Sequence, residues 1–235
     1  LGNKEGEAAA LNNIAGIYYR KGDDEKALDF YQRSLNLEKD DKGKATTYNN
    51  IALVYSAKGD HKKAIEYLHK AIELGERVGD YHGVAQRYLN LGYAYIKVKN
   101  YELAERYLTE GLKRIQRVGD KYWEAYGYEI LGLLYLDKGE NKLAVEYVSK
   151  AYNLYKNIGA KSKAEELEKV LALLFIVQLL EVDSEKTKSE VKPEKKEEEV
   201  KPSMPQGEAK PEKAEDNVKT PKSQDTGKRD VKKKK

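Results

Sequence analysis

The sequence contains no cysteine among its 235 residues and only one methionine. Without cysteine the chain has no disulfide framework, no thiolate zinc site and no cysteine nucleophile. Long apolar runs are also missing, since the longest, Val170–Leu180, has 11 residues and includes Gln178. A membrane-spanning helix needs about 20 apolar residues. The sequence therefore predicts no membrane span and excludes the small disulfide-rich folds.

Proline is absent from the first 180 residues, and aromatic residues are absent from the rest of the chain. All five prolines lie after residue 180, whereas all 19 tyrosines, both phenylalanines and the one tryptophan lie before it. We therefore divide the chain into a body, 1–180, and a tail, 181–235. The tail is rich in Lys, Glu and Pro and buries too little apolar surface to offset its chain entropy, so we expect it to be disordered. Its basic end, Lys232–Lys235, leaves open a weak contact with an anionic surface or a nuclear address.

No part of the chain carries a large excess of charge of one sign. The 44 Lys and Arg residues stand against 40 Asp and Glu residues, and the net charge of +4 divides equally between body and tail. Domains made for nucleic acid usually carry a basic patch that is visible in this balance. We expect no specific nucleic-acid partner.

Residues arranged for catalysis or metal binding are scarce. The three histidines, His61, His69 and His82, form no pair at the helical spacing i, i+4. The phosphate-binding patterns GxxxxGK[ST] and GxGxxG are missing, and no serine lies in GxSxG. A catalytic acid needs a desolvated pocket that tunes its pKa, and no pattern points to one. We expect no enzyme activity, no catalytic residue, no metal site and no cofactor.

The body contains a fourfold internal repeat. Four segments, 13–18, 50–55, 90–95 and 130–135, align on an Ile or Leu followed by Ala or Gly and, three residues later, Tyr. They are 37 residues apart once and 40 residues apart twice. After each comes a turn and then a second stretch with apolar residues at i, i+3, i+4 and i+7, the stripe of an amphipathic helix. A single helical hairpin leaves one face unburied, so the hairpins must stack.

This order of residues resembles the tetratricopeptide repeat, and the 40-residue period resembles its extended kinesin-light-chain type. The first aromatic of the motif is Tyr48, Tyr88 and Tyr128 in three copies and Leu11 in the first, while the proline that often closes the repeat is missing. The resemblance covers residues 6–157 and implies an all-α, right-handed superhelical solenoid of antiparallel helix hairpins. The expected segments are a linker from a truncated upstream repeat (1–5), four repeats (6–41, 42–80, 81–120 and 121–160), a capping helix (161–180) and the tail.

The expected capping helix is apolar over more of its circumference than a cap requires. A stripe suited to covering the last hairpin consists of Leu167, Val170, Leu171, Leu174 and Phe175. Further apolar residues fall outside that stripe: Leu173, Ile176, Val177 and Leu180. Residues 170–180 are therefore either an unusually apolar cap or a surface that pairs with a second copy or a partner.

One polar position of the repeat points to binding. The residue before the core Ile or Leu is Asn13, Asn50 and Asn90 in three repeats and Ile130 in the fourth. A carboxamide offers one acceptor and two donors, which suits the alternating N–H and C=O groups of an extended peptide. Extended-repeat proteins of the kinesin-light-chain sort and bacterial peptide-pheromone receptors are similar in using asparagines here to bind peptide main chain. The alternative is that these asparagines form hydrogen bonds between adjacent helices.

Other polar and aromatic residues surround these asparagines on the first helix of each repeat, the concave side of such an array. The candidate peptide-binding residues are Asn13, Asn50, Asn90, Tyr19, Arg20, Asn49, Gln86, Tyr93, Lys97, Tyr126 and Glu129. Charge changes from Arg20 and Lys97 to Glu129 and Asp137 along this side. We expect a ligand with an acidic part over the earlier repeats and a basic part near the fourth.

The sequence as a whole predicts an adaptor or scaffold that binds a protein or an extended peptide in a concave groove, with a cytoplasmic location. Two alternatives remain open at this point. The chain is a regulatory sensor module of a larger protein, or it is a structural module that self-associates through residues 170–180.

Overall fold

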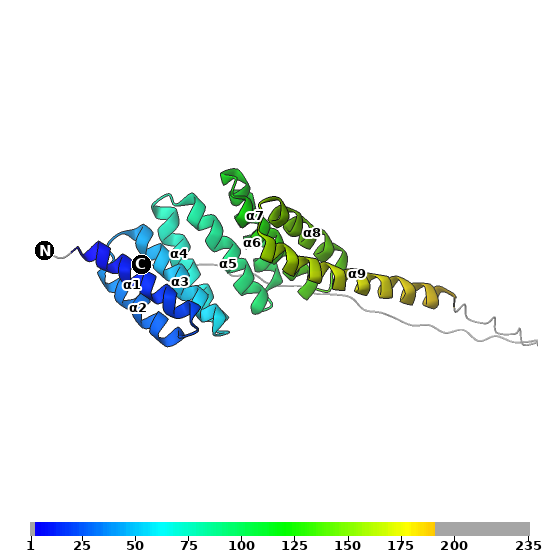
Figure 1. Cartoon of the computed structure of the whole chain (residues 1–235), viewed down its shortest axis with the longest axis horizontal. Coiled ribbons are helices and arrows are strands. Elements are labelled where there is room, and N and C mark those ends of the chain that lie inside the picture. Colours follow the sequence, from blue (N-terminus) through cyan, green and yellow to red (C-terminus); the bar gives the residue numbers. More distant parts are fainter. Residues whose placement is uncertain (1–2, 191–235) are drawn as a thin grey trace, which may run out of the picture. The chain divides into compact units, whose positions relative to one another are not determined.

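The protein is seen in a computed structural model that describes residues 3–190, with side chains described up to residue 180. Over this range the chain is all α-helical, which confirms the predicted fold class (Figure 1). The nine helices are α1 (Lys4–Arg20), α2 (Asp24–Leu37), α3 (Asp41–Ala57), α4 (His61–Arg77), α5 (Tyr81–Lys97), α6 (Tyr101–Val118), α7 (Lys121–Asp137), α8 (Asn141–Asn157) and α9 (Lys161–Glu190).

A side-chain cap sets the start of most of these helices. The oxygen of an Asp or Asn accepts a hydrogen bond from the backbone N–H three residues later, which satisfies one of the otherwise unpaired donors of the first turn. This cap occurs at Asn3, Asp23, Asp40, Asp60, Asp80, Asn100 and Asp120. The cap at Asn3 explains why α1 begins inside the segment 1–5 that we had expected to be a linker.

Short turns with a left-handed residue end the helices. Gly59 lies at φ 80° between α3 and α4, and glycines occupy the matching place in most other turns. Lys99 takes that conformation between α5 and α6 with φ 59°, where a side chain is less easily accommodated. These two- or three-residue connections force consecutive helices to run antiparallel as hairpins.

The hairpins stack into a solenoid. Each odd-numbered helix packs along the next even-numbered one, and α1, α3, α5 and α7 also contact one another in succession, so the first helices form one continuous layer. Close approach within a hairpin depends on small residues. A methyl group at Gly92 of α5 would overlap the Leu108 side chain of α6, and Gly132 of α7 has the same relation to Val148 of α8.

Aromatic rings reinforce every hairpin at an equivalent position. The ring pairs Tyr55–Tyr67, Tyr95–Tyr107 and Tyr135–Tyr147 stack with centroids 5.3–5.5 Å apart, and Tyr18 stacks on Phe30 at 5.3 Å in the first hairpin. Each pair joins the two helices of one hairpin. In the first, second and fourth hairpins a lysine ammonium also lies about 5 Å from the centre of one ring, that of Tyr18, Tyr55 or Tyr135.

The last helix, α9, packs on α8 through Ala164, Leu167, Leu171 and Leu174, which are at most 8% exposed. It continues to Glu190, ten residues past the predicted end of the capping helix. The reason is local, because no glycine or proline follows Gly159 until Pro193. The rest of the tail, predicted to be disordered, lies outside the described residues.

Candidate functional site

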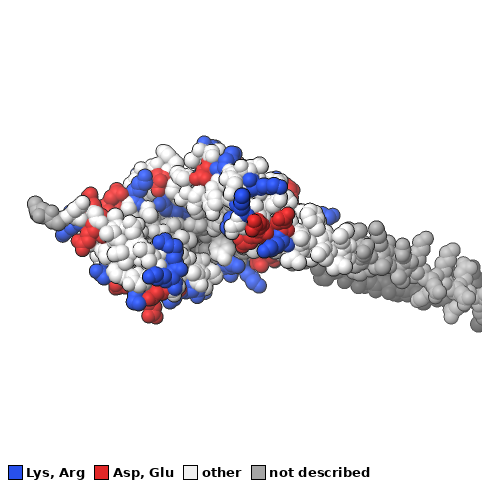
Figure 2. Space-filling model, viewed as in Figure 1, with Lys and Arg blue, Asp and Glu red and all other residues white. Residues whose placement is uncertain are grey.

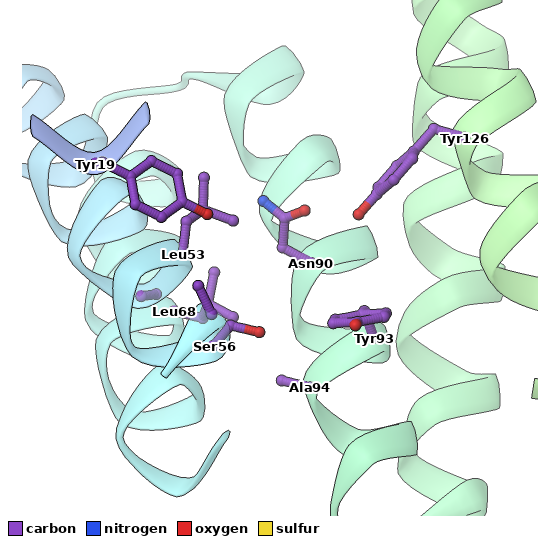
Figure 3. Close-up of a pocket in the computed structure, with 10 residues that line it drawn as sticks. Tyr19, Leu53, Ser56, Leu68, Asn90, Tyr93, Ala94 and Tyr126 are labelled. Carbon is purple, nitrogen blue, oxygen red and sulfur yellow. The ribbon is translucent and has the colours of Figure 1, made fainter. Parts of the chain in front are cut away.

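The layer of first helices carries two adjoining hollows. The first has a volume of about 200 Å³ and receives residues from α1, α3, α4, α5 and α7 (Figure 3). Its lining consists of Tyr19, Ala52, Leu53, Ser56, Ala57, Leu68, Asn90, Tyr93, Ala94 and Tyr126. Four of these residues, Tyr19, Asn90, Tyr93 and Tyr126, were predicted as peptide-binding residues from the sequence.

The second hollow, of about 380 Å³, lies between α1 and α3. It is lined by Asn12, Asn13, Gly16, Ile17, Tyr19, Arg20, Tyr31, Asn50 and Leu53. Tyr19 and Leu53 belong to both hollows, so together they follow the first-helix layer from the first repeat to the fourth. We call this combined surface the groove.

Three tyrosines contribute hydroxyl groups to the first hollow. Figure 3 shows the Tyr19 and Tyr126 hydroxyls reaching into it from opposite walls, with the Tyr93 ring below them. Among the described residues, none of the three hydroxyls has a hydrogen-bonding partner. Burial is the main cause that raises the pKa of Tyr126, followed by the charge of Glu129, and burial also raises the pKa of Tyr19. The Tyr19 and Tyr126 hydroxyls therefore keep their protons at neutral pH and remain hydrogen-bond donors.

Two of the three predicted asparagines bond to the preceding repeat. The Asn90 side-chain amide donates to Asn49 Oδ1 at 3.1 Å, and the Asn50 amide donates to Asn12 Oδ1 at 3.1 Å. Asn12 in turn donates to the buried Thr47 hydroxyl at 2.5 Å. The inter-helix role that the sequence left open is thus present. One amide hydrogen and the carbonyl oxygen of Asn50 and of Asn90 remain without a partner among the described residues.

The inter-helix role also explains why the asparagine pattern stops at the third repeat. Asn50 and Asn90 each pair with the residue that precedes the asparagine position one repeat earlier. In the third repeat the residue before the asparagine is Leu89, which cannot accept a hydrogen bond from a side-chain amide. The fourth repeat has Ile130, an apolar residue, at the asparagine position. Both are at most 4% exposed and belong to the same apolar core.

The remaining predicted residues differ in how accessible they are. Asn13 is exposed in the second hollow beside Arg20. Gln86 lies outside both hollows, 3.2 Å from His82. Glu129 is occupied, because its two carboxylate oxygens accept hydrogen bonds from Tyr155 at 2.8 Å and Lys163 at 2.9 Å.

Positive charge lies next to the first hollow. The Lys97 ammonium is 5.2 Å from the centre of the Tyr93 ring. His61, whose ring lies 3.5 Å from the Ser56 hydroxyl, has its pKa lowered by burial first and by Lys97 second. Elsewhere on the face drawn in Figure 2, basic and acidic side chains are interspersed.

The sequence analysis missed the apolar part of the groove. Leu53 separates the two hollows, Leu68 lines the first, and Tyr31 of α2 lines the second. Leu53 follows Asn50 by three residues and so shares its helix face, a spacing that could have identified it. Leu68 and Tyr31 belong to second helices, where the repeat pattern does not distinguish groove from core.

The described part of the chain contains neither a metal-binding cluster nor a membrane-spanning helix. No three His, Asp or Glu side chains gather there in a way that could hold a metal ion. None of the described helices is both apolar enough and long enough to cross a bilayer.

Comparison with protein families identifies the repeats. Family models described as tetratricopeptide repeat match residues 10–45, 43–114 and 88–157, which together exceed half of the chain. No curated protein matches the chain.

Solved structures share the fold at low sequence identity. BtubC (BKLC) from P. vanneervenii is 18% identical with a TM-score of 0.57, over 87% of this chain and 89% of its own. Aspartyl phosphate phosphatase F from Bacillus subtilis is 16% identical with a TM-score of 0.68, over 74% of this chain and 46% of its own. A Rap protein complexed with Competence and Sporulation Factor is 17% identical with a TM-score of 0.67, over 77% and 51%. The chain spans about half the length of these last two proteins.

Proposed function

The chain belongs to the tetratricopeptide repeat family, and we propose that it is a protein-interaction module whose groove binds an extended peptide segment of a partner protein. The observation that carries this proposal is the convergence, on one hollow, of donors that have no partner among the described residues, beside leucine and alanine side chains. Tyr19, Tyr93 and Tyr126 come from three different first helices, and Asn90 lies among them. Ligand sites of proteins commonly combine an apolar lining with a few polar groups that fix orientation.

The donors favour a ligand rich in acceptor oxygens. Three phenol hydroxyls and the free amide hydrogen of Asn90 donate, whereas the Asn90 carbonyl oxygen is an acceptor aimed into the hollow (Figure 3). Peptide carbonyl groups and a carboxylate meet this requirement. Lys97 and Arg20, beside the first and second hollows, favour the carboxylate, so we propose an acidic peptide.

Neither hollow offers an acidic side chain for the basic end expected in such a ligand. That expectation rested on Glu129 and Asp137. Both oxygens of Glu129 already have partners, and Asp137 accepts a hydrogen bond from the Tyr101 hydroxyl at 3.0 Å and lines neither hollow. A Rap protein of the same fold was solved with Competence and Sporulation Factor bound. At 17% identity only the fold is shared, and the proposal therefore depends on the groove itself.

The proposal is tested by selecting binders to the full chain from a random dodecapeptide display library and measuring them by calorimetry. Asn90→Ala should weaken a selected peptide about tenfold, the effect of losing about 1.4 kcal/mol of hydrogen bonding. Asn49→Ala is the matched control, because it removes the same bond between α3 and α5 but keeps the Asn90 amide in the hollow. Equal affinity of the peptide for both variants and the parent chain would show that Asn90 is structural only.

The hydroxyl groups are tested separately from the rings. The triple variant Tyr19→Phe, Tyr93→Phe, Tyr126→Phe keeps the aromatic walls, and we expect it to bind the selected peptide at least tenfold more weakly. Tyr81→Phe is the control, since Tyr81 is 77% exposed and lies outside both hollows. Circular dichroism verifies that the triple variant is folded. An unchanged dissociation constant in a folded triple variant would contradict the role of the hydroxyls.

The acidic character of the ligand has its own test. A selected peptide should lose affinity when its Asp and Glu residues are replaced by Asn and Gln, and its binding should weaken as salt is raised. The double variant Arg20→Glu, Lys97→Glu should abolish that preference. If the neutral peptide binds as well as the acidic one, the groove binds main chain without selecting charge.

A further inference from the structure

Exposed apolar side chains concentrate on one short part of α9. Of the 15 large apolar residues that are exposed in the described part of the chain, six fall within residues 173–180. They are Leu173 (66%), Phe175 (50%), Ile176 (54%), Val177 (40%), Leu179 (66%) and Leu180 (64%). Figure 2 shows uncharged surface where this end of α9 leaves the hairpins. A concentration of this kind marks a contact surface.

Four of these residues form a second stripe on the helix. Leu173, Ile176, Val177 and Leu180 are spaced i, i+3, i+4 and i+7, which places them on one face. The first stripe, from Ala164 to Leu174, is buried against α8. At 100° per residue the two stripes are roughly 135° apart. A second helix can therefore occupy the exposed stripe while α8 holds the buried one.

The amino-acid composition of residues 191–235 does not match the exposed stripe. Residues 191–235 contain no leucine, isoleucine or aromatic residue, and 14 of these 45 residues are lysine or arginine. Such a sequence cannot provide an apolar stripe of helical spacing. Residues 191–235 are therefore not the occupant of the exposed stripe.

We propose that the exposed stripe pairs with the same stripe of a second copy in antiparallel orientation. The spacing i, i+3, i+4, i+7 reads the same in both directions. A two-fold axis between residues 176 and 177 therefore sets Leu173 against Leu180 of the partner subunit, and Ile176 against Val177 of the partner subunit. Such self-complementarity is what a symmetric dimer requires.

Charge selects the antiparallel orientation. Glu166 and Lys169 lie on the same side of α9 as the stripe, seven and four residues before Leu173. In a parallel pair of α9 helices, each of these residues would face the same residue of the second copy across the helix–helix contact. Like charges in contact oppose association. In the antiparallel pair the two-fold axis moves them to opposite ends. The contact between the two stripes is only about two helical turns long, so we expect a weak dimer with a dissociation constant on the order of micromolar.

Sedimentation of the full chain from about 1 to 300 μM tests the pairing. We expect dimer to form with increasing concentration, and Leu173→Lys to shift the dissociation constant at least tenfold upward. Leu136→Lys is the matched control, because Leu136 is an exposed leucine (41%) of α7 away from this stripe. A monomer at every concentration, or a dimer unaffected by Leu173→Lys, would overturn the proposal.

Disulfide trapping tests the orientation of the two helices. Because the chain has no cysteine, any disulfide must form between the introduced cysteines. Chains carrying Leu173→Cys and chains carrying Leu180→Cys are oxidised alone and as a mixture. The antiparallel pairing predicts a cross-linked dimer in the mixture and little in either sample alone. Cross-linking of the Leu173→Cys chain with itself, equal to that of the mixture, would overturn the antiparallel arrangement.

Discussion

Replacing Arg87 by methionine is expected to lower the free energy of unfolding by about 3–5 kcal/mol, the usual cost of removing one partner of a buried ion pair. Arg87 of α5 is only 4% exposed, and its Nη1 lies 3.0 Å from Asp80 Oδ2. Asp80 is itself largely buried and caps α5 by accepting from the Gly83 N–H at 3.2 Å. Methionine fills much of the space of the arginine stem but leaves this carboxylate without a cation.

The surrounding backbone shows how closely the guanidinium is held. A methyl group added at Gly75 of α4 would lie 2.6 Å from Arg87 Nη1, and one at Gly83 would lie 2.9 Å from it. The arginine therefore joins the end of the second hairpin to the start of the third. Its loss should weaken the junction between two repeats as well as the cap of one helix.

Urea denaturation followed by circular dichroism measures the effect of Arg87→Met. Arg106→Met is the control, because Arg106 is an exposed arginine of α6, and we expect a change within about 0.5 kcal/mol. A loss below about 1 kcal/mol for Arg87→Met would mean that water reaches Asp80 and that the pair is not effectively buried.

Replacing Leu89 by alanine is expected to cost about 2–5 kcal/mol, through lost burial and the cavity left behind. Leu89 of α5 is fully buried. Its Cδ2 would lie 2.9 Å from a methyl group added at Gly111 of α6 and 3.4 Å from one added at Gly127 of α7. The side chain thus fills a space that two glycines create on neighbouring helices. Because glycine has no side chain to relax inward, the cavity should collapse poorly.

The same denaturation experiment compares Leu89→Ala with Leu136→Ala. Leu136 is 41% exposed and its replacement should cost less than about 1 kcal/mol. An unchanged slope of the free energy with urea would show that the variant loses stability without a change in the compactness of either state. Similar losses for the two leucines would contradict the packing described around Leu89.

Much of the groove could be predicted from the sequence because equivalent residues of successive repeats occupy equivalent places in the stack. Tyr19, Tyr93 and Tyr126 come from three different repeats, and the regular stacking of first helices brings them to one hollow with Asn90. Leu68, from a second helix, could not be predicted in the same way. Whether a second-helix side chain reaches the groove depends on the size of its first-helix neighbours.

The partners of the polar residues were not predictable either. Asn90 donates a hydrogen bond to Asn49, 41 residues away in the sequence, and Glu129 accepts one from Lys163, 34 residues away. These pairs depend on the rotation between successive hairpins, which follows from the volumes of many buried side chains together. The aspartate and asparagine caps at helix starts, by contrast, involve residues three apart and can be read from the sequence.

The sequence by itself determined the helices, their turns, their pairing into hairpins and the stacking of four repeats, because these depend on apolar periodicity and on interactions within a few residues. Tertiary structure alone decided which asparagines bond between repeats and that both oxygens of Glu129 accept hydrogen bonds. It also decided that three tyrosine hydroxyls have no partner among the described residues and that α9 leaves its second apolar stripe exposed. Each of these depends on small differences in the distances between segments far apart in the chain. Such distances result from the packing of the whole core.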